Sequence, residues 1–99
     1  MKFTKLFALI MLLSPTTVLS EQQYYRYKCY AVYLGGGDGI HFLSTTKEDI
    51  SAAYRHFDKK KVKSNKSKQV QIYKVEECVR ANEKFKRGRA QQLFNNMAL

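Results

Sequence analysis

The stretch that decides the fold runs from residue 24 to residue 34 and reads Tyr24-Tyr25-Arg26-Tyr27-Lys28-Cys29-Tyr30-Ala31-Val32-Tyr33-Leu34. It holds five of the seven tyrosines and one of the two cysteines. Tyrosine and valine suit a pleated, half-buried surface, so we predict one long β-strand. Strand side chains alternate between two faces, and the expected core face carries Tyr25, Tyr27, Cys29, Ala31 and Tyr33. The other face turns apolar toward its end and before that mixes rings with cations, namely Tyr24, Arg26, Lys28 and Tyr30.

The first twenty residues have the pattern of a secretory signal peptide. Lys2 and Lys5 form a short basic region, residues 6–13 are an apolar run, and Ser20 supplies a small residue at the expected cleavage point. A helix needs about 20 residues to span a bilayer, so the apolar run is too short to remain as an anchor. The sequence therefore predicts an exported protein that is periplasmic, at the cell surface or secreted. It also predicts no stable membrane insertion after signal removal and one small domain over residues 21–99.

Two cysteines in an exported chain fit one disulfide, although two buried thiols would fit the same count. A bond between Cys29 and Cys78 closes a loop of about 50 residues, for which the chain-entropy model gives on the order of 4 kcal/mol. That is a large share of the total stability of a small domain, which is about 5–15 kcal/mol. We therefore predict a disulfide between Cys29 and Cys78.

The charge is strongly positive. The formal net charge is +10, and it is +8 once Lys2 and Lys5 are removed. Such a domain is drawn to anionic partners, although a basic surface can also serve only for solubility. Two clusters carry the candidate contacts: Lys59, Lys60, Lys61, Lys63, Lys66 and Lys68, and then Lys84, Lys86, Arg87 and Arg89. Lysines on an exposed strand also oppose edge-to-edge pairing, so the first cluster fits a protected sheet edge as well as an anion-binding patch.

The segments after the first strand alternate between strand and helix patterns. Glycines at 35–39 predict a hairpin turn before a strand over residues 40–43, in which His41 is expected to point to solvent. Apolar residues then recur at helical spacing, so we predict a helix over residues 46–57, started by a capping box of Thr45 and Glu48. His56, near the end of that helix, is expected to cap it or face solvent.

Two more strands and a last helix follow. We predict a short strand near residues 60–63 and another over residues 69–75 that leads to Cys78. Cys78 has the parity of Ile72 but Val75 does not, so this strand either bulges near residues 74–76 or is buried on both sides. We predict that the amphipathic segment from Phe85 to Met97 becomes helical near Arg89. The prediction is a small α+β domain of order ββαββα, an antiparallel sheet with a helix packed on one face and one disulfide.

No catalytic constellation is present in the sequence, so we predict no enzyme activity and no cofactor. The cysteines do not form a C-x-x-C pair, and Glu76 and Glu77, as strand neighbours, point to opposite faces. Neither histidine has a second ligand at metal-binding spacing, so no metal site is predicted. The alternating rings and cations from Tyr24 to Tyr30 could hold single-stranded nucleic acid, but only if no helix covers that face, and no nucleic-acid-binding motif accompanies them.

Three short segments carry a resemblance to a known family. They are Tyr27-Lys28-Cys29-Tyr30, Val70-x-Ile72-Tyr73-x-Val75-x-Glu77-Cys78-Val79, and Asn82-Glu83-x-Phe85 followed by Arg89-Ala90-x-x-Leu93. In these segments the chain resembles the small exported Tap Y-type accessory proteins of type IVa pilus and secretion systems, across most of residues 21–99. The resemblance implies a non-enzymatic periplasmic or cell-surface component that acts beside a large pilus-associated adhesin.

The expected function is therefore that of a disulfide-stapled binding module. It would dock an acidic face of a pilus or secretion component through the two basic clusters. The alternative is a binder of anionic polymer, either DNA or envelope polysaccharide. Salt separates the two, because polymer binding weakens steeply as the salt concentration rises.

Overall fold

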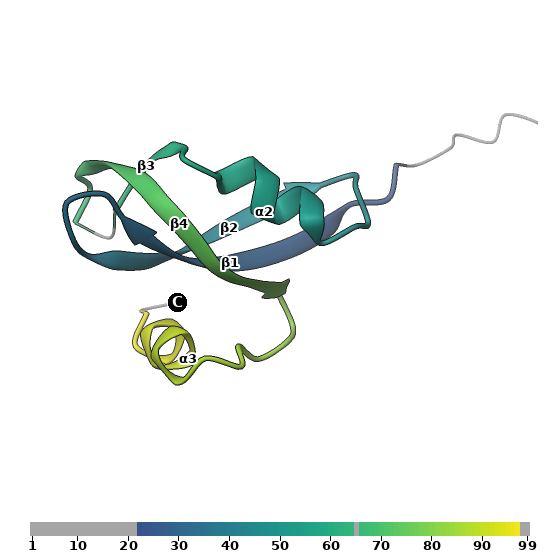
Figure 1. Ribbon diagram of the computed structural model, residues 1–99. Helices are drawn as coiled ribbons and strands as arrows, with labels where there is room; N and C mark the ends of the chain where they lie inside the picture. Colours follow the sequence, from purple (N-terminus) through teal and green to yellow (C-terminus); the bar gives the residue numbers. More distant parts are fainter. Residues whose placement is uncertain (1–21, 65, 98–99) are drawn as a thin grey trace, which may run out of the picture.

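The computed structural model describes residues 22–64 and 66–97, so the expected signal peptide lies outside the described residues. The elements in chain order are β1 (Tyr25–Tyr33), β2 (Asp38–Thr45), α2 (Ser51–Phe57), β3 (Lys61–Lys63), β4 (Gln69–Arg80) and α3 (Gly88–Asn95). The strands form one four-stranded antiparallel sheet in the order β2-β1-β4-β3 (Figure 1). The predicted α+β class and the order ββαββα are confirmed.

β1 is a central strand, as its tyrosine-rich sequence predicts, and it pairs with β2 on one side and β4 on the other. Cys29 lies directly opposite Cys78 of β4, and their sulfur atoms are bonded at 2.07 Å. The predicted disulfide is therefore confirmed, and it joins the two central strands of the sheet.

β4 is bulged where its hydrophobic pattern changes parity. The pairing with β1 shifts between Tyr30, which lies opposite Glu77, and Ala31, which lies opposite Val75. Glu76 is thus the extra residue of a β-bulge, which turns the following side chains to the other face. This confirms the bulge as the cause of the parity change.

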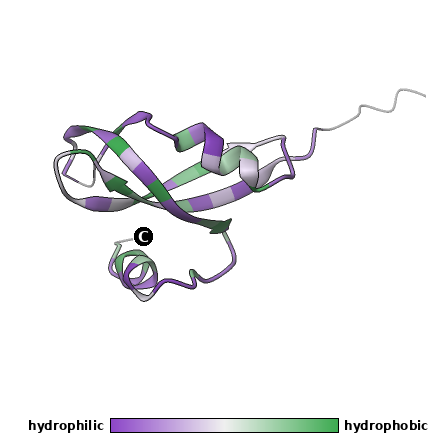
Figure 2. Cartoon of the chain, viewed as in Figure 1, coloured by the Kyte–Doolittle hydropathy of each residue, from purple (hydrophilic) through white to green (hydrophobic). Residues whose placement is uncertain are grey.

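The two helices cover opposite faces of the sheet (Figure 1). α2 packs on the face of β1 that carries Tyr27 and Cys29, with Phe57 buried against them. α3 packs on the other face, where Ala90 and Phe85 form a second cluster with Tyr30. A helix on one face was predicted and is found, and α3 adds a third layer. Figure 2 shows hydrophobic and hydrophilic residues alternating along β4, whose side chains point in turn to the two faces of the sheet.

The predicted start of the first helix is wrong. α2 begins at Ser51 rather than near residue 46, because the Asp49 carboxylate accepts the N–H of Ser51 at 3.1 Å and its hydroxyl at 2.6 Å. This local Asx turn replaces the capping box. Thr45 instead ends β2, and its hydroxyl oxygen accepts the N–H of Lys47 at 3.3 Å.

The prediction that His41 points to solvent is also wrong. His41 lies opposite Cys29 and therefore shares the face that α2 covers. Its Nε2 lies 2.7 Å from the Tyr33 hydroxyl oxygen, and its ring centroid is 5.8 Å from that of Phe57. Burial lowers the pKa of His41. His56 is exposed, as expected. Within residues 22–64 and 66–97 no helix is long and apolar enough to cross a membrane.

Candidate anion-binding groove

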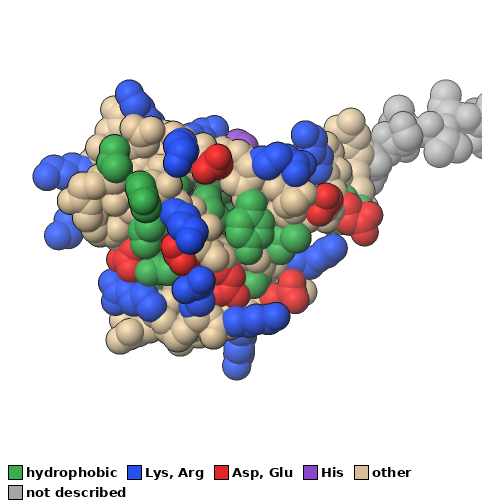
Figure 3. Space-filling model, viewed as in Figure 1, with side chains coloured by type: hydrophobic (Ala, Val, Ile, Leu, Met, Phe, Trp, Pro, Cys, Tyr) green, Lys and Arg blue, Asp and Glu red, His purple; other side chains and the backbone are tan. Residues whose placement is uncertain are grey.

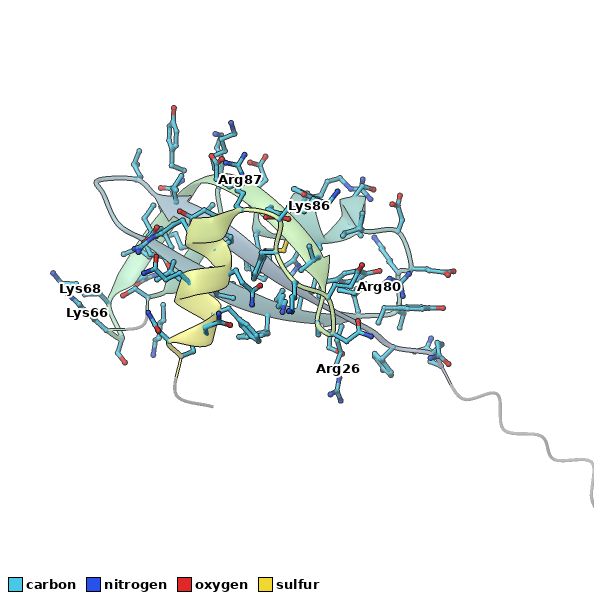
Figure 4. The ribbon with its side chains drawn as sticks, turned by 90° about the horizontal axis from the view of Figure 1, so that it is seen from below. Arg26, Lys66, Lys68, Arg80, Lys86 and Arg87 are labelled. Atoms are coloured by element: carbon cyan, nitrogen blue, oxygen red, sulfur yellow. A yellow bond between two sulfur atoms is a disulfide. The ribbon has the colours of Figure 1, made fainter. Side chains whose placement is uncertain are left out.

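The two predicted basic clusters lie on the surface around β3 and around the start of α3. All ten of their side chains are exposed. Figure 3 shows Lys and Arg spread over one face of the molecule with Asp and Glu between them, rather than gathered in one patch. In Figure 4, Lys66 and Lys68 extend from one end of the molecule, whereas Lys86 and Arg87 lie elsewhere on the α3 layer. The two clusters therefore do not form one continuous basic surface.

Three residues from the two clusters line one groove. Lys66 and Lys68, in the turn between β3 and β4, come together there with Arg89 in the first turn of α3. The groove has a volume of about 470 Å³, and its other side is the tip of the β1–β2 hairpin at Gly36 and Gly37. Sequence positions 66 and 89 thus meet only through the tertiary fold.

The hairpin tip contributes backbone to this side of the groove at Gly36 and Gly37, next to Tyr33. Gly36 and Gly37 have φ values of 109° and 92°, which glycine adopts without strain. Val70 of β4 and Leu93 of α3 add apolar surface to the lining. The groove therefore combines cations at its rim with apolar contact area.

Arg89 is already paired within the molecule. Its guanidinium donates to both carboxylate oxygens of Asp38, at 2.9 and 3.0 Å, and the Tyr30 hydroxyl donates to the same carboxylate at 2.7 Å. These bonds tie the first turn of α3 to the first residue of β2. The hydrogen bond from Arg89, and then that from Tyr30, hold the pKa of Asp38 below its ordinary value although burial opposes the shift. Lys66 and Lys68 consequently supply the uncompensated charge of the groove.

This network predicts a specific acid sensitivity. A carboxyl whose folded pKa is depressed contributes stability above its ordinary pKa of 3.8, and that contribution is lost as the pH falls through the folded value. We expect Asp38→Asn to be less stable than the parent protein at pH 6, with the difference shrinking below pH 3.8. Urea unfolding followed by circular dichroism at both pH values measures this. A stability difference that is the same at pH 6 and pH 2.5 would contradict the role of the Asp38 charge.

Half of the candidate aromatic face is not on the surface. α3 covers Lys28 and Tyr30, which are only 2% and 7% exposed. The Lys28 ammonium lies 3.7 Å from the ring centroid of Phe94 and 5.2 Å from that of Phe85, and burial lowers its pKa. The hypothesis of an open ring-and-cation face is therefore wrong for these two residues, because the amphipathic helix packs over them. Tyr24 and Arg26 remain exposed at the end of the sheet.

Glu77 has a role that the sequence did not reveal. Its side chain is buried, and its two carboxylate oxygens accept the N–H groups of Lys86 and Arg87 at 2.8 and 3.0 Å. The neighbouring Glu76 pairs with the Arg87 guanidinium at 3.1 Å. Glu77 thereby fixes the loop that leads into α3, and with it the second basic cluster. The one sequence signal was its place beside Cys78 in a segment that carries the family resemblance.

No group of three or more His, Cys, Asp or Glu side chains that could hold a metal ion is found in the described part of the chain.

The second basic cluster differs from a free anion patch, because Arg87 and Arg89 have acidic partners. Of the residues predicted to bind, Lys66, Lys68 and Arg89 line one groove, and of these three Arg89 is the one with an acidic partner among the described residues.

Comparisons with curated proteins and with solved structures find no match to this chain. A protein-family model does match, and it is described as type IVa secretion system protein TapY2-like. The match runs over residues 6–98, so it includes the disulfide and every helix and strand of the described residues, from β1 to α3. The chain therefore belongs to the TapY2-like family of type IVa secretion system proteins.

Proposed function

We propose that residues 21–99 form an exported, non-enzymatic accessory domain that docks an acidic face of another component of the type IVa secretion apparatus. The family supports the setting, and the disulfide fits a protein of the periplasm or cell surface. The observation that carries the proposal is the groove in which Lys66 and Lys68 lie beside Arg89.

The groove suits a protein partner because it offers two kinds of contact. Among residues 22–64 and 66–97 the ion pairs are Lys74–Glu76, Arg87–Glu76 and Arg89–Asp38, so Lys66 and Lys68 keep their charge for a partner. Lysine is a flexible, strongly hydrated point charge that suits the solvated rim of an interface. Val70 and Leu93 supply apolar area that a carboxylate-bearing loop could cover. A pure polymer-binding surface would need only the charges.

The test reverses charge inside and outside the groove. We expect Lys66→Glu with Lys68→Glu to reduce recovery of the bound apparatus component by about tenfold or more, because each reversed rim charge replaces attraction with repulsion. The matched control is Lys61→Glu with Lys63→Glu, which makes the same change of net charge on exposed positions of β3 that do not line the groove. Affinity purification from the exporting cell, quantified by mass spectrometry, measures both variants.

Equal loss in both variants would show that net charge, and not the groove, governs binding. Failure of the parent protein to recover any component of the apparatus, at any salt concentration, would overturn the proposal. The alternative of an anionic polymer predicts binding to DNA or envelope polysaccharide whose affinity falls steeply and log-linearly with salt. A protein dock keeps an apolar component that salt affects less.

A further inference from the structure

The two edges of the sheet are built differently, and one of them is protected. β3 is short, and its two exposed residues are Lys61 and Lys63, which oppose pairing with another strand. β4 extends beyond β3, but its open edge is interrupted by two register shifts against β1. The Tyr54 hydroxyl also accepts the N–H of Cys78 at 3.0 Å on that edge. Bulges and covered backbone groups of this kind prevent strand addition.

The opposite edge, β2, has none of these devices. β2 spans eight residues, pairs with β1 without a register shift, and contains no lysine, arginine or proline. The N–H of Tyr33 donates to the Gly37 carbonyl at 2.9 Å, and hydrogen-bonded pairs alternate along an antiparallel ladder. Phe42 and Ser44 therefore direct their N–H and C=O groups away from β1. No loop or side chain in the described residues bonds to these backbone groups.

The side of this edge that faces α2 is hollow and basic. A hollow of about 230 Å³ lies between Leu43 and Thr45 of β2 and the outer side of α2. Its lining includes Lys47, Arg55 and His56 and no carboxylate. Burial, and then the charge of Lys60, lower the pKa of His56, so Lys47 and Arg55 supply the positive charge. The Asp49 carboxylate accepts from Ser51, whose hydroxyl oxygen accepts from Arg55, so a hydroxyl group stands between this carboxylate and the Arg55 guanidinium.

The side of the edge that faces α3 is apolar. Phe42 is 50% exposed, and its ring centroid lies 6.4 Å from that of Phe94 on α3. An added strand beside β2 would place one set of alternate side chains over these rings and the other set over the basic hollow. The two environments therefore define a pattern of period two.

We propose that the free edge of β2 accepts an extended segment of a partner protein as a fifth strand. Its alternate side chains are acidic toward Lys47 and Arg55 and apolar toward Phe42 and Phe94. Main-chain hydrogen bonds provide affinity in this mode of recognition, and alternate side chains provide specificity. A second copy of this chain is a poorer occupant, because pairing two β2 edges antiparallel brings both sets of Lys47 and Arg55 to the same face. The inference does not depend on the groove at Lys66 and Lys68, which involves other residues.

The probe is a short synthetic peptide in which glutamate and valine alternate, added to the oxidised, isotope-labelled protein. We expect amide chemical-shift changes in NMR spectra to centre on Phe42 to Thr45. Ser44→Pro removes one outward N–H at a position where an edge strand tolerates proline, and we expect it to weaken binding about tenfold. The matched control Ser44→Ala keeps the N–H and is expected to bind as the parent does.

A second measurement leaves the protein unchanged. N-methylation of the peptide residues whose N–H groups point toward β2 should abolish binding. N-methylation of the intervening residues, whose N–H groups point away from β2, should not. A peptide of alternating lysine and valine should bind at least about tenfold more weakly than the glutamate peptide, and Arg55→Glu should narrow that difference. Shifts centred on Lys66 and Lys68, equal effects of both methylation patterns, or no binding at millimolar peptide would each overturn the proposal. Concentration-dependent shifts at β2 without peptide would show self-pairing and would overturn it as well.

Discussion

Replacing Cys29 and Cys78 together by alanine is expected to lower the free energy of unfolding by about 4 kcal/mol, the largest effect we predict. The bond closes a long loop, since the two cysteines are 49 positions apart in the sequence. Opening it restores conformational freedom to the unfolded chain, which native contacts then have to offset. A domain of this size has a total stability of about 5–15 kcal/mol. Urea denaturation followed by circular dichroism measures the change.

The parent protein provides the control for this experiment. Reducing its disulfide should lower its stability to nearly that of the double alanine variant, while the variant itself should not respond to the reductant. Agreement between the two would assign the effect to the cross-link and not to the small cavities left by the missing sulfur atoms. A loss below about 1 kcal/mol in the double variant would show that strand pairing alone already restricts the unfolded ensemble.

Glu77→Ala is expected to cost on the order of 3 kcal/mol, because two backbone N–H groups lose a charged acceptor in a partly buried place. Glu77 is only 8% exposed, and its oxygens bond to the N–H groups of Lys86 and Arg87. Without them the loop before α3 loses its attachment to β4. Amide hydrogen exchange should therefore accelerate most in α3 and least in the paired residues of β1 and β4 next to the disulfide of Cys29 and Cys78.

The adjacent residue gives a matched comparison. Glu76→Ala removes a carboxylate of the same size that pairs with Lys74 and Arg87, both of which are more than half exposed. An ion pair with an exposed partner contributes about 0–1 kcal/mol, so losing the two pairs of the 17% exposed Glu76 should cost at most about 2 kcal/mol. If both variants lost the same free energy, the backbone hydrogen bonds of Glu77 would not be what holds the loop.

Local sequence patterns located the strands and the disulfide, although β2 and β4 extend beyond the predicted residues 40–43 and 69–75. Period-two alternation identified the core face of β1, and the parity change at Val75 indicated a bulge in β4 that the register confirms. The start of α2 was missed because two local arrangements compete for the same backbone groups. The Thr45 capping box and the Asp49 turn both satisfy N–H groups, and the sequence does not rank them.

The α3 layer could not be predicted because it depends on contacts between distant parts of the chain. A lysine at an alternate strand position normally indicates a solvated face, and Lys28 was a candidate contact only on the condition that no helix covered it. Phe85 and Phe94 approach it only after α3 has packed on the sheet. The groove could not be predicted for the same reason. Lys66 and Arg89 are far apart in the sequence, and they line one groove only after α3 has packed on the sheet beside the hairpin tip. Several residues of the third segment that carried the family resemblance, such as Phe85 and Ala90, are buried in this layer.

The position of the disulfide also has a consequence for assembly. Cys29 and Cys78 face each other across two adjacent strands, so a slip of one residue in that pairing would turn one sulfur to the opposite face of the sheet. The bulge at Glu76 already shifts the alternation of the β4 side chains by one position, so a pairing of β1 and β4 that is displaced by one residue competes with the native register. Oxidation can therefore capture only chains whose central strands are correctly aligned. The disulfide therefore forms only after β1 and β4 have paired in the correct register, and it then stabilises that pairing.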